Sequence, residues 1–252
     1  MREIRPGDGG HVVVVDGHLQ SHVDLDDPRR LVFDYVRRLG DLVDVLAPDG
    51  TPLRVVHVGG AGMTLARYVA ATRPRSSQVV LEPDEELTAL VRRELPLPPR
   101  SGIKVRPVDG RAGLPALPDG RADLLVLDAY DAGRVPPKLL TAPALAEVAR
   151  VLAPSGSALL NVADQAPFPL VRTAVAGLRP VLPHVAAGME PATRRARRPG
   201  NVLLLASRQP LPVAAWRSRS STGAAPYRVL DADGVSASFG GGTPAKDPDT
   251  AC

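Results

Sequence analysis

The hydrophobic pattern of this chain changes at residue 53, where short aliphatic runs begin to alternate with amphipathic stretches of helical length. The runs predict seven strands, at Leu53 to Val58, Gln78 to Glu82, Ile103 to Val108, Ala122 to Asp128, Ser157 to Val162, Val181 to Ala187 and Val202 to Ser207. The stretches predict helices at Met63 to Thr72, Asp84 to Leu95, Pro137 to Leu152 and Pro167 to Gly177, the third ended by a turn at residues 153–156. Alternating strands and helices are typical of βαβ units. The sequence therefore predicts an α/β fold with a mostly parallel, Rossmann-like sheet and helices on both of its faces.

The segment before residue 53 has a different pattern. Two β-prone runs flank Asp16-Gly17, a dipeptide that suits the positive φ angles of a tight hairpin turn. Apolar positions then recur at helical spacing from Leu31 to Leu46, and Pro28 suits the first turn of a helix after an acidic cap. We expect a small N-terminal β-hairpin followed by one helix.

Composition narrows the description of the core. The chain has 252 residues, of which 44% are hydrophobic and only 3% aromatic, so its core consists of Val, Leu and Ala, as in buried parallel strands. Periodicity weakens after residue 208. We expect a hairpin and helix over residues 1–50, a nucleoside-binding catalytic domain over 51–208 and a C-terminal extension over 209–252 whose end is disordered.

Charge and cysteine content exclude several classes of protein. The single cysteine, Cys252, rules out an internal disulfide framework and a thiolate zinc site. Residues 1–10 lack the apolar stretch of a secretion signal and no uncharged apolar run approaches about 18 residues, so we expect a cytoplasmic protein without a membrane partner. The net charge of +4 does not predict a nucleic-acid partner, and a homodimer stays open. One basic cluster is either a solvated loop or a contact for an anionic substrate or nucleic acid: Arg194, Arg195, Arg197 and Arg198.

A loop of small residues follows the first predicted strand of the sheet. It consists of Gly59, Gly60, Ala61 and Gly62. Small side chains let the backbone approach a ligand closely, and the following helix offers free amide groups at its N-terminus. A tight turn without a ligand is the alternative. The complete G-x-G-x-x-G spacing is absent because Leu65 stands three places after Gly62, and this disfavours a NAD-dependent oxidoreductase.

Three carboxylates follow the ends of predicted strands. Glu82 ends the second strand, about 20 residues after the glycines, where an acidic side chain can hold the hydroxyls of a ribose. Asp109 follows the third strand and Asp128 closes the fourth, although each could instead be a helix cap or a solvated loop residue. Ligands of open α/β sheets bind outside the carboxyl ends of the strands. The sequence therefore predicts a nucleoside site there.

These motifs together resemble the spermidine synthase family, whose fold is that of S-adenosylmethionine-dependent methyltransferases. The likeness rests on Val-Gly-Gly-Ala-Gly, Leu-Glu-Pro-Asp, Val-Asp-Gly-Arg-Ala-Gly-Leu, Leu-Leu-Val-Leu-Asp-Ala-Tyr-Asp and the hairpin Asp16-Gly-His-Leu-Gln20. It covers approximately residues 11–207. The phrase from Ala70 to Arg75 and the Phe239-Gly-Gly-Gly ending resemble more narrowly the actinobacterial spermidine-synthase-like proteins.

The resemblance implies roles for individual residues. S-adenosylmethionine or its decarboxylated form would be bound by Gln20 near the sulfonium, Gly59, Gly60, Ala61 and Gly62 along the amino-acid or aminopropyl portion, Glu82 at the ribose, and Asp109 with Gly110 beside the adenine. Asp128 would hold and deprotonate the attacking amine, and Asp131 would help to bind the same cationic substrate. No metal is required, because the thioether that leaves is stable.

The chain departs from the family pattern at three places, one of which is the stretch Ala-Gly-Arg-Val-Pro-Pro-Lys after Asp131, where the loop over the acceptor is changed. Gly62 stands where the family's loop has an aspartate that grips the aminopropyl ammonium, and Leu31 to Tyr35 does not match the family's Tyr-His-Glu-type sequence. The leading hypothesis is aminopropyl transfer to a small amine or another nucleophilic acceptor. Methyl transfer to a small molecule and a non-catalytic nucleoside-binding homologue are the alternatives.

Overall fold

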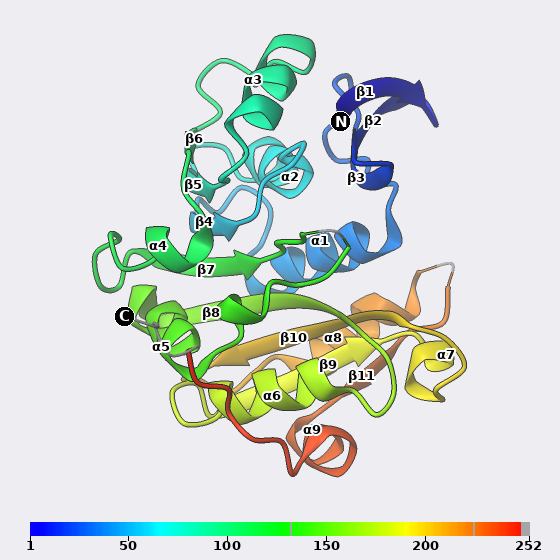
Figure 1. The fold of residues 1–252 in the computed structure, drawn as a ribbon, viewed down its shortest axis with the longest axis vertical. Helices are drawn as coiled ribbons and strands as arrows, with labels where there is room; N and C mark the ends of the chain where they lie inside the picture. The colour runs from blue at the N-terminus through cyan, green and yellow to red at the C-terminus, as the bar shows by residue number, and fades with distance from the viewer. Residues whose placement is uncertain (132, 224, 248–252) are drawn as a thin grey trace.

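The centre of the fold is an eight-stranded sheet, seen in a computed structural model that describes residues 1–131, 133–223 and 225–247 (Figure 1). In spatial order its strands are β11 (Arg228–Leu230), β9 (His184–Met189), β10 (Gly200–Ser207), β8 (Leu152–Asp164), β7 (Ala122–Leu127), β4 (Arg54–Val58), β5 (Ser77–Leu81) and β6 (Ile103–Arg106). The strands from β8 to β6 pair in parallel, whereas the pairings that involve β9, β10 and β11 are antiparallel. The predicted α/β class is confirmed.

The C-terminal part of the chain has more structure than its weak periodicity predicted. Residues 209–247 contain α8 (Val213–Ser221), the strand β11 and α9 (Ala232–Phe239). β11 is the eighth strand of the sheet, beyond the seven predicted, and it pairs with β9. The predicted turn at residues 153–156 lies within β8, whose pairing with β7 skips from Leu152 to Ser157. The expected disorder of the chain's end, including Cys252, falls on residues 248–252, which lie outside the described residues.

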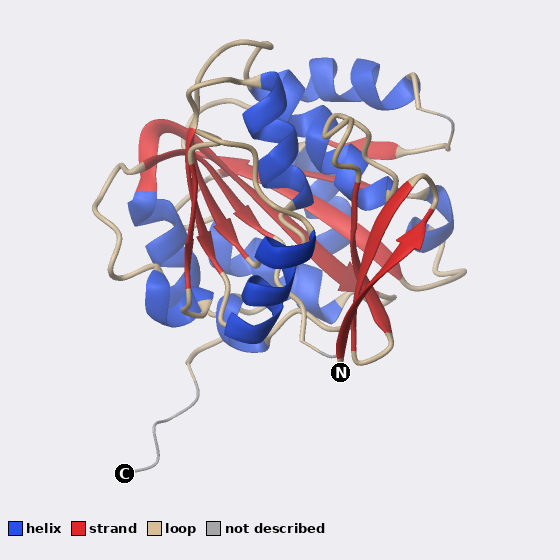
Figure 2. Ribbon diagram, turned by 90° about the horizontal axis from the view of Figure 1, so that it is seen from above, coloured by secondary structure: helices blue, strands red, loops and turns tan. Residues whose placement is uncertain are grey.

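The four helices predicted within the sheet region are present. They are α2 (Thr64–Thr72), α3 (Glu85–Glu94), α5 (Ala142–Val151), which follows a short 3₁₀ turn η1 (Pro137–Leu139), and α6 (Pro169–Leu178). Two single-turn helices, α4 (Gly110–Gly113) and α7 (Pro191–Arg194), were not predicted. Helices cover both faces of the sheet (Figure 2). Across the described ranges, no helix combines the length and apolar character needed to cross a membrane.

The N-terminal helix α1 (Asp34–Leu46) begins later than Pro28, so the predicted start is wrong. The acidic residues before Pro28 do not cap a helix. Asp24 accepts hydrogen bonds from the backbone N–H groups of Asp26 and Asp27, at 3.0 and 2.9 Å, and this local pattern closes a turn instead. Apolar side chains of α1, α2 and α8 share one core on one face of the sheet.

The first residues form a three-stranded antiparallel sheet and not a two-stranded hairpin. Its strands are β1 (Arg2–Gly7), β2 (Gly10–Val15) and β3 (His18–Val23), in that order. The predicted tight turn is present, with positive φ at Asp16 and Gly17. Val13 and Val23 pack with Met63 and with apolar residues of α3. The small sheet is thereby joined to the region around the small-residue loop.

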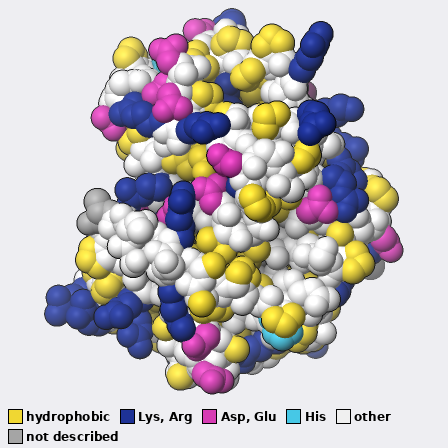
Figure 3. All heavy atoms as spheres, turned by 180° about the vertical axis from the view of Figure 1, so that it is seen from behind, with side chains coloured by type: hydrophobic (Ala, Val, Ile, Leu, Met, Phe, Trp, Pro, Cys, Tyr) yellow, Lys and Arg dark blue, Asp and Glu magenta, His cyan; other side chains and the backbone are white. Residues whose placement is uncertain are grey.

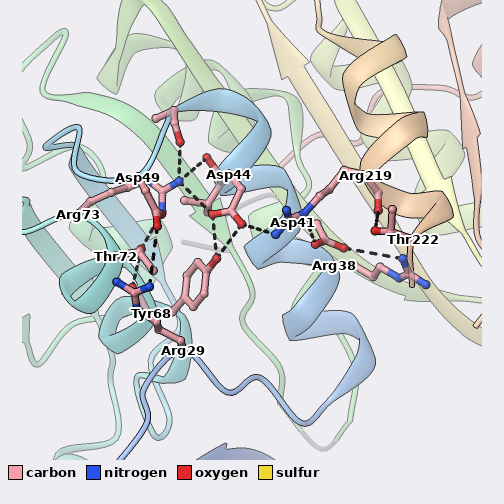
Figure 4. Close-up of polar contacts among 12 residues, drawn as sticks. Arg29, Arg38, Asp41, Asp44, Asp49, Tyr68, Thr72, Arg73, Arg219 and Thr222 are labelled. Carbon is pink, nitrogen blue, oxygen red and sulfur yellow. Dashed lines mark hydrogen bonds and ion pairs between the residues drawn. The ribbon is translucent and has the colours of Figure 1, made fainter. Parts of the chain in front are cut away.

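A network of charges ties α1 to helices from distant parts of the chain (Figure 4). Arg73, whose side chain is fully buried, pairs with Asp44 of α1 at 3.0 Å. Tyr68 of α2 donates to Asp44 at 2.8 Å, and Arg219 of α8 pairs with Asp44 at 2.6 Å and with Asp41 at 2.9 Å. A buried cation needs such partners because its desolvation is costly. The network fixes α1, and with it the first turn of α1 beside the site described next.

Candidate functional site

A cleft of about 450 Å³ opens at the carboxyl ends of β4, β5 and β7. The chain runs from β4 outward to β5 and β6 and then returns to the other side of β4 with β7, so the strand order reverses at this point. The cleft is lined by every predicted site residue except Gly62: Gln20, Gly59, Gly60, Ala61, Glu82, Asp109, Gly110, Asp128 and Asp131. Residues from the N-terminal sheet and from the main sheet therefore share one concave site.

The small-residue loop after β4 needs glycine for a steric reason. Gly59 has a φ of 92°, and a Cβ atom there would lie 2.4 Å from the backbone oxygen of Asp128. Ala61 and Met63 also have positive φ angles. The loop thus approaches the backbone after β7 at contact distance, and this contact by itself requires glycine at position 59. The close approach to a ligand stays a prediction.

Glu82 holds this loop through its carboxylate. Its Oε2 accepts hydrogen bonds from the N–H groups of Gly60 and Ala61 at 2.9 and 3.1 Å, and its Oε1 accepts from Asp84 N–H at 2.9 Å. A carboxylate offers about four acceptor positions, so one position on Oε1 is left for a ligand hydroxyl. The side chain is both a loop clamp and a candidate ribose ligand.

Asp109 is a helix cap as well as a cleft residue. Its Oδ1 accepts hydrogen bonds from the N–H groups of Arg111 and Ala112 at the start of α4, and its Oδ2 pairs with Lys138 at 3.2 Å. Burial would raise the pKa of Asp109, but the backbone hydrogen bonds and Lys138 hold it below its usual value. At neighbouring Gly110 a Cβ atom would meet Val58 Cγ1 at 2.2 Å, so glycine is required. Across the described parts of the chain, no group of three or more His, Cys, Asp or Glu side chains is placed to hold a metal ion.

Asp128 lies at the base of the cleft directly after β7. Burial raises the pKa of its carboxyl group to about 6, and the hydrogen bond that Asn161 Nδ2 donates to Oδ1, at 2.9 Å, works in the opposite direction. A smaller cavity of about 50 Å³ adjoins this carboxylate and is also lined by Tyr35, Tyr130 and His57. At neutral pH, therefore, Asp128 is mostly ionised but is close to the pH at which it takes up a proton.

Three residues around Asp128 were not predicted. Tyr35 Oη donates to the backbone oxygen of Gln20 at 3.3 Å, and Tyr130 Oη donates to the backbone oxygen of Asn161 at 3.1 Å. Burial, followed by the charge of Asp128, raises the pKa of both tyrosines, so both stay protonated hydrogen-bond donors. Asn161 could have been found from the sequence, because it is a polar residue in the middle of an aliphatic strand.

Gly62 is absent from the cleft lining because it faces the N-terminal sheet. Its N–H donates to Ser21 Oγ at 3.1 Å, and a Cβ atom at this position would lie 2.8 Å from Ser21 Cβ and 2.9 Å from Val23 Cγ2. Asp131, by contrast, is an exposed residue at the rim, where its N–H donates to the backbone oxygen of Arg134. The structure brings Asp131 into the cleft but leaves Gly62 behind it.

Comparison with known proteins gives structural matches. A probable spermidine synthase from Corynebacterium glutamicum ATCC 13032 is 25% identical, with a TM-score of 0.93 over 100% of this chain and 94% of that chain. A spermidine synthase in complex with the transition state analogue AdoDATO is 17% identical, with a TM-score of 0.63 over 94% and 80%. Human methyltransferase-like protein 13 in complex with SAH is 21% identical, with a TM-score of 0.58 over 75% and 89%. No family model and no curated protein matches the chain. The expected resemblance to spermidine synthases is thus confirmed for the whole fold.

Proposed function

We propose that this protein is a spermidine-synthase-like transferase, which binds S-adenosylmethionine or its decarboxylated form and transfers an aminopropyl group to a small amine acceptor. The observation that carries the proposal is Asp128, a half-buried carboxylate in a cleft at the switch point of the sheet, whose pKa is raised to about 6 by desolvation. The likeness to the probable spermidine synthase, and the AdoDATO bound by a second relative of the same fold, support this assignment.

The cleft residues fit a nucleoside co-substrate. The volume of the cleft, about 450 Å³, lies in the range of small-molecule sites. Glu82 Oε1 has an acceptor position for a ribose hydroxyl, and Gly59 and Gly60 let the ligand approach the backbone. When bound, the co-substrate supplies a carbon atom made electrophilic by the adjacent sulfonium. Gln20 and Asp109 also line the cleft.

Asp128 performs the proton chemistry in this proposal. An ionised carboxylate attracts the acceptor's ammonium group, and Asn161 occupies Oδ1, which leaves Oδ2 to take the proton. The neutral nitrogen then forms a bond to the carbon, while the carbon–sulfur bond breaks and its electron pair stays on sulfur. Positioned base catalysis of this kind contributes about 10²–10⁴-fold, and alignment of the reactants adds more.

Methyl transfer is a second candidate, and Gly62 favours it. No carboxylate stands at this position to hold an aminopropyl ammonium, and Ser21 and Val23 occupy the space that a side chain would need. Loss of a charge-assisted hydrogen bond removes about 1.5–3 kcal/mol of preference for the decarboxylated co-substrate. The SAH in the solved structure of human methyltransferase-like protein 13 shows that a related fold binds a methyl-transfer product.

The test is mass spectrometry of the nucleoside that copurifies with the protein, followed by turnover with each co-substrate and a set of small amines. Methylthioadenosine indicates aminopropyl transfer, and S-adenosylhomocysteine indicates methyl transfer. Glu82→Gln should weaken binding of either nucleoside. Nucleoside binding without turnover would indicate a non-catalytic homologue, and binding of neither nucleoside by calorimetry would overturn both forms of the proposal.

A further inference from the structure

A second concave site lies at the β11 edge of the sheet, the edge opposite β6. It has a volume of about 520 Å³ and is formed between α7, the end of α8 and β11. We call it the arginine pocket and define it by Arg194, Arg195, Ser220, Tyr227 and Arg228. The space-filling view shows a dense group of Lys and Arg side chains over the position of α7 (Figure 3).

The arginines of this pocket differ from their neighbours in lacking acidic partners. Arg198 pairs with Glu190, and Arg217 pairs with Asp231 at 2.6 Å. Within the part of the chain that the structure describes, Arg194, Arg195 and Arg228 form no ion pair, and no Asp or Glu lines the pocket. Three exposed positive charges thus line one hollow without an acidic partner, and Arg194 and Arg195 also border a neighbouring hollow of about 510 Å³.

A buried hydrogen-bond donor lies beside these charges. The hydroxyl group of Ser220, a residue that is only 3% exposed, has no partner among the described residues, whereas the Tyr227 hydroxyl faces Gly188 of β9 inside the sheet. Arg195 Nε donates to the backbone oxygen of Pro191 at 3.2 Å, which restrains this side chain. Guanidinium groups present a planar fork of donors that matches the oxygen atoms of a phosphate.

We propose that the arginine pocket binds the phosphate group of a small phosphorylated ligand. The pocket has the volume of a small-molecule site, and its positive charge is local, since the chain as a whole carries a net charge of only +4. A protein that binds the phosphate backbone of a nucleic acid instead presents an extended basic surface. Two members of the basic cluster, Arg194 and Arg195, are thereby assigned to a phosphate ligand, whereas Arg198 is paired with Glu190.

The pocket is separate from the proposed reaction. A cavity of about 200 Å³ lies between the two sites, lined by Tyr227 on the side of the arginine pocket and by Tyr35 on the side of Asp128. None of the residues proposed to bind the nucleoside or the amine lines the arginine pocket. Phosphate binding can therefore be tested whether or not the protein catalyses transfer.

The experiment is calorimetric titration of the full chain with inorganic pyrophosphate. The double variant Arg194→Gln/Arg195→Gln should bind at least about tenfold more weakly, since one charge-assisted hydrogen bond corresponds to a factor of that size. Arg228→Gln should also weaken binding. The control variant Arg92→Gln/Lys104→Gln removes two exposed charges, one from α3 and one from β6 at the opposite edge of the sheet. It should bind pyrophosphate as the unmodified protein does.

Thermal unfolding of each variant checks that the fold is intact. Because the substituted residues are exposed, we expect every variant to stay folded. No pyrophosphate binding, or equal weakening in the control, would overturn the proposal. A second titration with a single-stranded RNA of 20 nucleotides separates the alternatives. RNA binding that depends on Arg194 and Arg195, in the absence of pyrophosphate binding, would replace the phosphate pocket with a nucleic-acid surface.

Discussion

Replacement of Asp128 by Asn should strongly reduce turnover and at the same time stabilise the folded protein. The amide keeps the shape of the carboxylate, and its oxygen can still accept the hydrogen bond from Asn161. It cannot take a proton from an ammonium group, so kcat/KM should fall by about 10²–10⁴-fold. If the proposed function holds, kcat/KM of the unmodified protein should rise with pH through about 6, where the Asp128 carboxyl group ionises.

The gain in stability follows from the pKa of Asp128. Its value rises from 3.8 to about 6 on folding because burial disfavours the charged form. The folded state binds the proton more tightly than the unfolded state, so this group lowers the free energy of unfolding as pH rises from 3.8 to 6. A shift of this size corresponds to about 3 kcal/mol. The Asp128→Asn variant has no ionisable group at this position, so its free energy of unfolding is not lowered in this way. Its gain in stability over the unmodified protein should be near zero at pH 4 and complete above pH 7.

Urea unfolding of both proteins at pH 4, 6 and 8 measures this difference. Asp131→Asn is the matched control, because Asp131 is an exposed acid three residues away and should give no comparable gain at any of these pH values. If the Asp128 variant were less stable than the unmodified protein at pH 8, or if it retained full turnover, the description of this carboxylate as a buried, desolvated base would be refuted.

Three further predictions concern neighbouring residues. Gly62→Ala places a methyl carbon 2.8 Å from Ser21 Cβ and should destabilise the protein by about 1–3 kcal/mol in urea unfolding, whereas an unchanged midpoint would contradict the packing described. Asn161→Ala removes a hydrogen bond that lowers the pKa of Asp128, so the acidic limb of the rate profile should move to higher pH; an unmoved limb would count against this role. Burial lowers the pKa of His57 to about 4, so the neutral ring of the folded state contributes stability that is lost as pH falls from 6.5. His57→Leu should reduce the difference in the free energy of unfolding between pH 7 and pH 4.5 by up to about 3 kcal/mol. An equal difference in both proteins would disprove this role.

The sequence predicted the strands that bury aliphatic residues on both faces and the carboxylates at their ends. Glu82 and Asp128 follow strands of this type, Asp109 follows the half-exposed edge strand β6, and the parallel arrangement brings the ends of all three strands to one edge of the sheet. β11 was missed because three residues at a sheet edge carry too little periodicity to be recognised. β1 was missed for a related reason, since its side chains are exposed or only partly buried.

The missing parts of the site are those that depend on tertiary contacts. Tyr35 is in the first turn of α1, and its place beside Asp128 depends on the packing of α1 against the sheet. Tyr130 lies two residues after the predicted Asp128, but its position depends on Asn161 of the neighbouring strand β8. The direction in which Gly62 faces likewise depends on a sheet formed by residues far away in sequence. Hydrophobic spacing contains no information about any of these contacts.

The junction between the N-terminal sheet and the small-residue loop has a consequence for the order of folding. Ser21 bonds to Gly62 across 41 residues of chain, and Thr64 Oγ1 donates to the backbone oxygen of His22 across 42. During synthesis β1 to β3 leave the ribosome before the loop and α2 exist, so this sheet must wait for its docking partner. Gln20 reaches the cleft only after that docking. Nucleoside affinity therefore depends on contacts between segments that are about 40 residues apart in the chain.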